Sequence, residues 1–112
     1  MLYDFVAKIK NVQNKDTLND ESLAEVVSEI NDRHGDPLEV KFVLQNADSS
    51  GEVLVKSQAS VSSMLSLHDK ELDVAINAFI LYLEEIAAAI QGEISKQDGF
   101  YNNTKTFKRL FN

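Results

Sequence analysis

The sequence predicts a small α+β domain made of two N-terminal helices, an antiparallel β-hairpin, one long hydrophobic helix and a short C-terminal tail. Three observations predict this class. Residues 72–90 carry an apolar helical seam, residues 20–34 carry the start and stop signals of a helix, and residues 38–45 alternate apolar with polar side chains. At 112 residues the chain fits a single core. We expect one domain over residues 1–97, with a tail at 98–112 packed on it.

The N-terminal segment is expected to form a short amphipathic helix over residues 2–13. Five apolar side chains of this segment share one helical face: Leu2, Phe5, Val6, Ile9 and Val12. The competing interpretation is a strand with alternate residues from Tyr3 to Ile9 on one side. It is weaker because it places Leu2 and Val6 on the opposite side.

The second helix is predicted over residues 20–34 by signals at both of its ends. Asn19 is a favourable N-cap, and two acidic residues follow it in the first turn. At the other end, Gly35 can adopt the left-handed conformation that ends a helix, and Pro37 prevents its continuation.

A β-hairpin is predicted from two β-rich runs on either side of a turn-forming stretch. Residues 38–45 alternate with the period of a half-buried strand, and residues 51–57 form the second run. The polar sequence between them favours an antiparallel connection. The following residues, 58–66, fit a strand, a loop or an early helical turn equally well.

The long helix is predicted from residue 67 to about residue 97. Ser66 and Asp69 resemble a capping box at its start, and Gly99 is available as its stop. Six residues form its seam: Leu72, Ile76, Phe79, Leu83, Ile86 and Ile90. Most of the remaining circumference is also apolar, so the helix must be covered by the rest of the chain or by a second copy.

The tail is aromatic and basic. Phe107, Leu110 and Phe111 would share one face of a short terminal helix. We expect these rings to dock on the domain, since exposed aromatic clusters are uncommon without a function. The alternative is a partner-binding peptide, because the sequence from Lys108 to Phe111 resembles the basic-x-Leu-Phe docking motif that cyclins recognise.

Charge is spread unevenly along the chain. The net charge is −7, of which the tail from Asp98 contributes +2, so residues 1–97 carry −9. Such a body repels phosphate backbones and attracts basic proteins, so we expect a basic protein partner and no direct binding of nucleic acid. The chain has no cysteine, which favours an intracellular, cytoplasmic setting. Its N-terminus does not resemble a secretion signal, and two glutamates near the middle of the long helix argue against a membrane span.

No motif of catalysis, cofactor binding or metal binding stands out. The serines lack a nucleophile frame, and the glycines form no phosphate-binding loop. His68 with Glu71, joined by His34 and Asp36, is a weak candidate for a divalent metal site, because surface helices often carry such pairs.

The order of elements is similar to that of small acidic proteins with which phages and bacteria block an enzyme by direct binding. We therefore predict a non-enzymatic binding protein that inhibits a protein partner, with no cofactor. The alternative is a homo-oligomeric structural protein that dimerises through the long helix, and an enzyme ranks third. The residues expected to bind the partner are Glu71, Glu84, Glu85, Lys108, Arg109 and Phe111.

Overall fold

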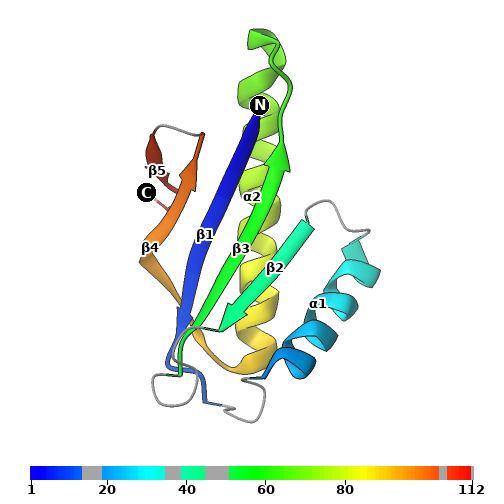
Figure 1. The fold of residues 1–112 in the computed structure, drawn as a ribbon, viewed down its shortest axis with the longest axis vertical. Coiled ribbons are helices and arrows are strands. Elements are labelled where there is room, and N and C mark those ends of the chain that lie inside the picture. Colours follow the sequence, from blue (N-terminus) through cyan, green and yellow to red (C-terminus); the bar gives the residue numbers. More distant parts are fainter. Residues whose placement is uncertain (14–18, 35–38, 45–50, 104–105, 112) are drawn as a thin grey trace.

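Five strands and two helices make up the described part of the chain (Figure 1). The structure, a computed structural model, describes residues 1–13, 19–34, 39–44, 51–103 and 106–111, with the backbone alone at residues 34 and 39–44. In chain order the elements are β1 (Leu2–Lys10), α1 (Asp20–His34), β2 (Glu39–Leu44), β3 (Val53–Ser60), α2 (Leu65–Ile90), β4 (Glu93–Asn102) and β5 (Phe107–Arg109).

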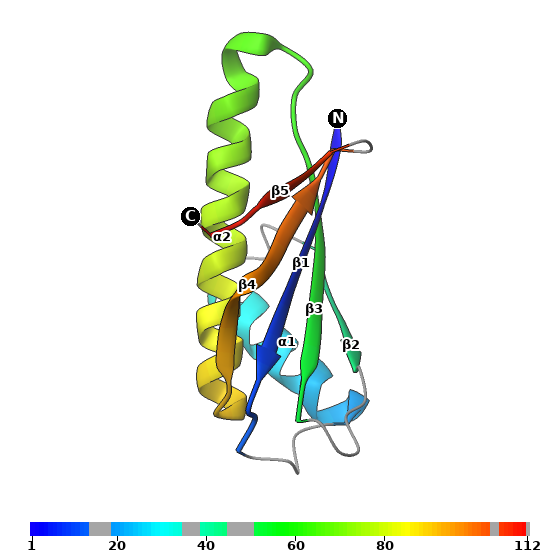
Figure 2. The ribbon, with the colours of Figure 1, turned by 90° about the vertical axis from the view of Figure 1, so that its left-hand side faces the viewer.

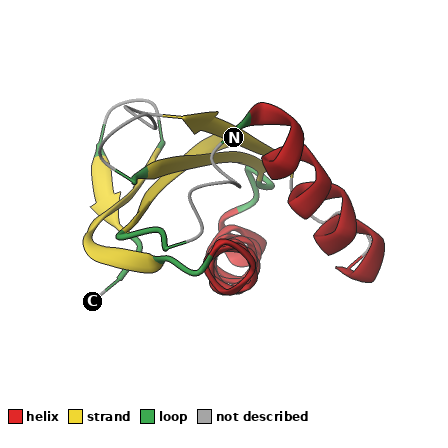
Figure 3. Cartoon of the chain, turned by 90° about the horizontal axis from the view of Figure 1, so that it is seen from below, coloured by secondary structure: helices red, strands yellow, loops and turns green. Residues whose placement is uncertain are grey.

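The strands form one sheet in the order β2-β3-β1-β4-β5, and every neighbouring pair is antiparallel. Helix α1 connects β1 to β2, and α2 connects β3 to β4, so each helix links two strands that have a third strand between them. This is the split βαβ connectivity of ferredoxin-like folds. Helix α2 lies along one face of the sheet, and α1 lies beside it next to β2 (Figure 3). The opposite face of the sheet carries no helix in the described structure.

The prediction of two N-terminal helices is wrong, because residues 2–10 form β1 at the centre of the sheet. The residues that the strand interpretation grouped, Tyr3, Phe5, Ala7 and Ile9, are all at most 2% exposed. Leu2 is 48% exposed, and Val6 is half-buried on the open face. Apolar residues on both faces of this strand imitate a helical stripe over so short a segment. The pairing of β1 with β3 and β4 decides between the two conformations.

Helix α1 begins where its N-cap signal predicted and is helical through His34, the last described residue of this stretch. The Asn19 side-chain oxygen accepts a hydrogen bond of 2.8 Å from the Ser22 amide, which is the expected N-cap contact. Leu23 and Ile30 are 1% exposed and face the core. The predicted stop signals at residues 35–37 lie outside the described residues.

The hairpin is present, with β2 paired antiparallel to β3 from Leu44 opposite Val53 to Glu39 opposite Gln58. Strand β3 is longer than predicted and runs to Ser60, so it includes the first residues of the ambiguous 58–66 segment. Those extra residues pair with β1, where Ser60 stands opposite Leu2.

Helix α2 starts earlier and ends earlier than predicted. Its N-cap is Met64, without a side-chain hydrogen bond, so the proposed Ser66 and Asp69 capping box does not form. Its end is at Ile90, where Gln91 adopts the left-handed conformation at φ 56° and the Gly92 amide bonds to the Ala87 carbonyl at 2.9 Å. A Cβ on Gly92 would lie 2.5 Å from Cγ2 of Ile9, so glycine permits this close turn into β4.

The predicted seam of α2 forms the centre of the core. Five of its six residues are at most 8% exposed, and Ile76 is half-buried. The rings of Phe79 and Phe5 stack with centroids 5.4 Å apart, which joins the helix to the central strand. Neither described helix is both long enough and apolar enough to cross a membrane.

The C-terminal segment joins the sheet instead of forming a short helix. Strand β4 spans residues 93–102, and β5 pairs with it so that Arg109 stands opposite Phe100. Leu110 is 6% exposed, and its amide bonds to the Gly99 carbonyl at 3.1 Å. Phe107, which was expected to dock, is 70% exposed.

Candidate partner-binding surface

The acidic charge of the chain is concentrated on its helices. Each helix has five acidic residues and one basic residue, so α1 and α2 together carry a formal charge of −8. The five strands contain seven basic and four acidic residues, a formal charge of +3. We call the two helices the helical layer. It is the acidic side of a molecule whose sheet is weakly basic.

Helix α1 presents a stripe of carboxylates to solvent. Glu21, Glu25 and Glu29 follow each other at intervals of four residues and are all exposed, so they lie along one side of the helix. Like charges at this spacing destabilise a helix by about 0.2–0.5 kcal/mol per pair. The spacing of these three carboxylates therefore does not stabilise the helix, although Glu21 alone is favoured by its place in the first turn.

Among the described side chains, one ion pair connects the two helices of this layer. The Arg33 guanidinium lies 3.3 Å from a carboxylate oxygen of Glu85, at the C-terminal half of α2. Arg33 is the one arginine of α1, and the helix contains no lysine. Glu85, one of the predicted partner-binding residues, is thus already engaged within the chain, whereas its neighbour Glu84 is exposed.

The predicted partner-binding residues do not form one surface. Glu71, in the N-terminal half of α2, accepts a hydrogen bond of 2.5 Å from the Ser62 amide and so holds the loop before the helix. Lys108 and Arg109 are exposed on β5, the strand at the opposite edge of the sheet from β2. Phe111 is half-buried and packs beside Gly99. Of the predicted residues, Glu84 alone is both exposed and part of the helical layer.

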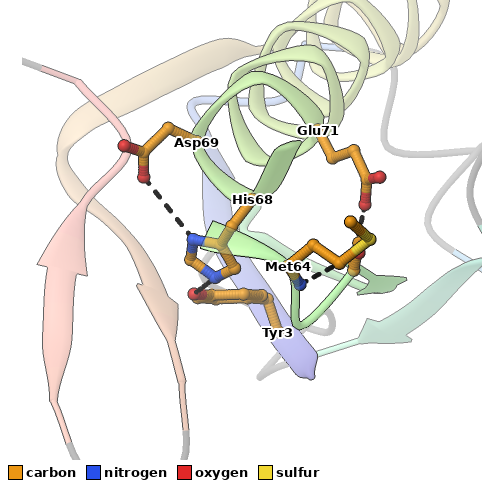
Figure 4. Close-up of polar contacts among 6 residues, drawn as sticks. Tyr3, Met64, His68, Asp69 and Glu71 are labelled. Carbon is orange, nitrogen blue, oxygen red and sulfur yellow. Dashed lines mark hydrogen bonds and ion pairs between the residues drawn. The ribbon is translucent and has the colours of Figure 1, made fainter. Parts of the chain in front are cut away.

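A polar cluster fixes the start of α2 to the sheet (Figure 4). The Tyr3 hydroxyl lies 2.5 Å from Nε2 of His68, and Nδ1 of the same ring lies 3.5 Å from a carboxylate oxygen of Asp69. Because a carboxylate accepts the Nδ1 proton, Nε2 is the acceptor for the Tyr3 hydroxyl. Tyr3 is 2% exposed, so this bond satisfies a buried hydroxyl group and leaves it inaccessible to a substrate.

The same cluster does not assemble the weak metal site that the sequence suggested. His68 points to Tyr3, whereas Glu71 points to the other side of the helix (Figure 4). Among the described residues, no group of three or more potential ligands could hold a metal ion. The side chain of His34 and the whole of Asp36 lie outside the described residues.

Tyr101 adds a titratable group beneath this cluster. Its ring lies 5.9 Å from that of Tyr3. Burial raises the pKa of the Tyr101 hydroxyl above its ordinary value of 10.0, and the carboxylates of Asp73 and Asp69 raise it further. The hydroxyl therefore stays neutral to a higher pH than an unperturbed tyrosine.

No protein-family model, curated protein or solved structure matches this chain. The functional conclusion therefore follows from the surfaces of the molecule.

Sequence reasoning missed two surface features. The first is a groove of about 410 Å³ on the open face of the sheet, where the Gln58 amide donates to Asp4 at 2.9 Å and Phe100 and Phe107 form an aromatic side. It could be found only by knowing which strands are neighbours. The second is the first turn of α2, where Met64, Leu65 and Leu67 are exposed. Its signal was present in the sequence, as apolar residues at a helix start where polar residues are preferred.

Proposed function

We propose that the protein is a non-enzymatic binding protein that attaches to a basic partner protein and thereby inhibits it. The observation that supports this is the concentration of eight net negative charges on the helical layer, next to a sheet of opposite sign. A net charge of −7 for the whole chain would indicate only good solubility. Charge gathered on one side of a molecule also orients an approaching partner.

The carboxylate stripe of α1 is the part of this layer best suited to that task. Glu21, Glu25 and Glu29 extend into solvent and repel each other. A basic surface brought against them would relieve this repulsion. Electrostatic steering of this kind raises association rates by roughly 10- to 1,000-fold and weakens as salt shortens the Debye length to about 3 Å at 1 M.

The alternative function, a dimer built on the apolar seam of α2, receives no support from the packing. Phe79, Leu83 and Ile86 are 0% exposed because the sheet of the same chain covers them. A homo-oligomer would therefore have to use another surface.

The immobilised protein is first used to capture its partner from the native host, and the partner is identified by mass spectrometry. The proposal is then tested by measuring the association rate of the protein with this partner. The variant Glu21→Gln/Glu25→Gln removes two charges from the stripe. The control Gln97→Lys/Thr106→Lys changes the net charge equally at exposed positions on β4 and just before β5. We expect the stripe variant to associate several-fold more slowly at low salt, and the control to be affected less.

Two results would contradict the proposal. One is a partner association rate that does not respond to salt. The other is an equal decrease of the association rate in the stripe variant and in the control. Such a result would mean that the net charge of the protein matters and the place of the charges does not. If the capture experiment at low salt recovers only this protein itself, self-assembly is favoured.

A further inference from the structure

We propose that the first turn of α2 is the anchor with which the protein enters an apolar pocket of its partner, a pocket rimmed by basic residues. We call Met64, Leu65 and Leu67 the apolar tip. This inference rests on the proposed function, because it assigns the contact that holds the basic partner after the helical layer has attracted it.

The apolar tip projects from the molecule. In two perpendicular views the start of α2 extends past the ends of the strands (Figures 1 and 2). Leu65 is 90% exposed, Met64 is 60% exposed and Leu67 is 44% exposed. Single exposed apolar residues are common, but here three of four consecutive positions are exposed apolar residues, and such clustering is typical of interaction sites.

The tip also contradicts the local chemistry of a helix start. Serine, threonine, aspartate and asparagine are preferred at the N-cap, yet this helix has Met64 there and no side-chain cap. Its first turn contains no acidic residue, although the helix dipole favours one. Positions that break local rules without a structural gain are expected at functional sites.

Polar contacts hold this unfavourable turn in one conformation (Figure 4). The Met64 amide donates to Oγ of Ser62 at 3.1 Å, and the Ser62 amide donates in turn to Glu71. The amide of His68 bonds to the Met64 carbonyl at 2.9 Å, while its ring holds the Tyr3 hydroxyl. A tip that is already ordered before binding loses little conformational entropy in the complex.

Charge around the tip identifies the chemistry of the pocket. Asp69 has a side chain that is 93% exposed, and Asp73 is exposed one turn further along α2. With Glu71 they place three carboxylates and one ammonium group, that of Lys70, directly behind the tip. An apolar pocket with a basic rim is complementary to this pattern, whereas an anionic membrane would not select three carboxylates.

The test measures binding of the identified partner by surface-binding kinetics. The variant Leu65→Ser/Leu67→Ser removes two of the three apolar side chains of the tip. The matched control is Val74→Ser/Leu81→Ser, because Val74 and Leu81 are 68% and 44% exposed and also lie on α2. Circular dichroism and thermal melts confirm that each variant folds. We expect the tip variant to raise Kd at least about 30-fold, mainly through faster dissociation, and the control to change Kd less than about threefold.

A photo-crosslinker at position 65 adds a readout that identifies the contact. We expect it to label partner residues that line an apolar pocket beside lysine or arginine. An unchanged Kd for the tip variant, or labelling of a second copy of this chain alone, would overturn the inference. If the tip variant loses binding but neither salt nor the stripe variant changes the association rate, the proposed steering is refuted and the anchor is supported. Failure of the wild-type chain to bind any partner would reject both.

Discussion

Replacing Met64 with serine is expected to stabilise the fold and weaken partner binding at the same time. The backbone at this residue has φ −74° and ψ 121°, the extended conformation of an N-cap. A serine hydroxyl here can accept the amide proton of Ser66, whereas the Leu67 amide already donates to the carbonyl of residue 64 at 3.1 Å. A serine cap is worth about 1 kcal/mol relative to a residue that cannot cap. The methionine side chain is 60% exposed, so its removal loses little buried surface.

The expected change in melting temperature follows from the size of the chain. An unfolding entropy of about 2.1 cal/mol/K per residue gives roughly 240 cal/mol/K for a domain of this length. A gain of about 1 kcal/mol therefore corresponds to a rise in Tm of about 4 °C. Removing one anchor residue should meanwhile raise Kd, because the tip would lose part of its apolar surface.

Differential scanning calorimetry and partner-binding kinetics measure the two effects on the same samples. The control is Met64→Ala, which removes the same side chain without adding a cap. It should weaken binding to the same extent while leaving Tm within about 2 °C of the wild type. A Met64→Ser variant that melts at a lower temperature would refute our account of the cap. One that binds as tightly as wild type would refute a role for Met64 in the anchor.

Two further predictions concern the core and the response to pH. Phe79→Ala should lower the free energy of unfolding by about 3–5 kcal/mol, because the ring is fully buried and stacked on Phe5, whereas the exposed Glu84→Ala should change it by less than about 0.5 kcal/mol. Urea melts compare them, and equal losses would mean that α2 is oriented wrongly. Stability should also fall as pH rises above the ordinary tyrosine pKa of 10.0, because the raised pKa of Tyr101 means that the folded state retains this proton after the unfolded state has lost it. In alkaline melts Tyr101→Phe should flatten this decline, and an equally steep decline in the variant would contradict the assignment.

Local signals in the sequence were sufficient to predict an element where neighbouring residues alone determine its conformation. Asn19 caps α1 through its own side chain, so the start of the helix could be placed without knowledge of the tertiary structure. The alternation in residues 38–45 likewise located β2, whose pairing with β3 is antiparallel as predicted. Both features depend on neighbours in the sequence. The start of α1 was therefore predicted correctly, and β2 lies within the predicted run, whose two end residues are outside the described part of the chain.

Signals failed where tertiary contacts decide between two conformations. Residues 2–10 have apolar side chains on both faces as a central strand, and such a pattern also fits a helix of this length. The helix predicted from residue 67 to about residue 97 includes Gly92, although the role of this glycine is to let the chain pass close to Ile9. The sheet-face groove depends on the strands lying side by side in the order β3-β1-β4-β5, and no local pattern carries that information.

The apolar tip projects because α2 is longer than the strands that it covers. At 1.5 Å per residue, the 26 residues of α2 span about 39 Å, whereas the nine residues of β1 span about 30 Å. The C-terminal end of α2 is fixed by the close turn at Gly92 beside Ile9. The excess of about 9 Å, or roughly six residues, must therefore project at the N-terminal end. It corresponds to residues 65–70, and Leu72 is indeed the first buried residue of the helix. Within this segment His68 still binds the buried Tyr3 hydroxyl, whereas Leu65 is 90% exposed, so it is the apolar residues at the tip, and not the whole segment, that are available for the proposed contact.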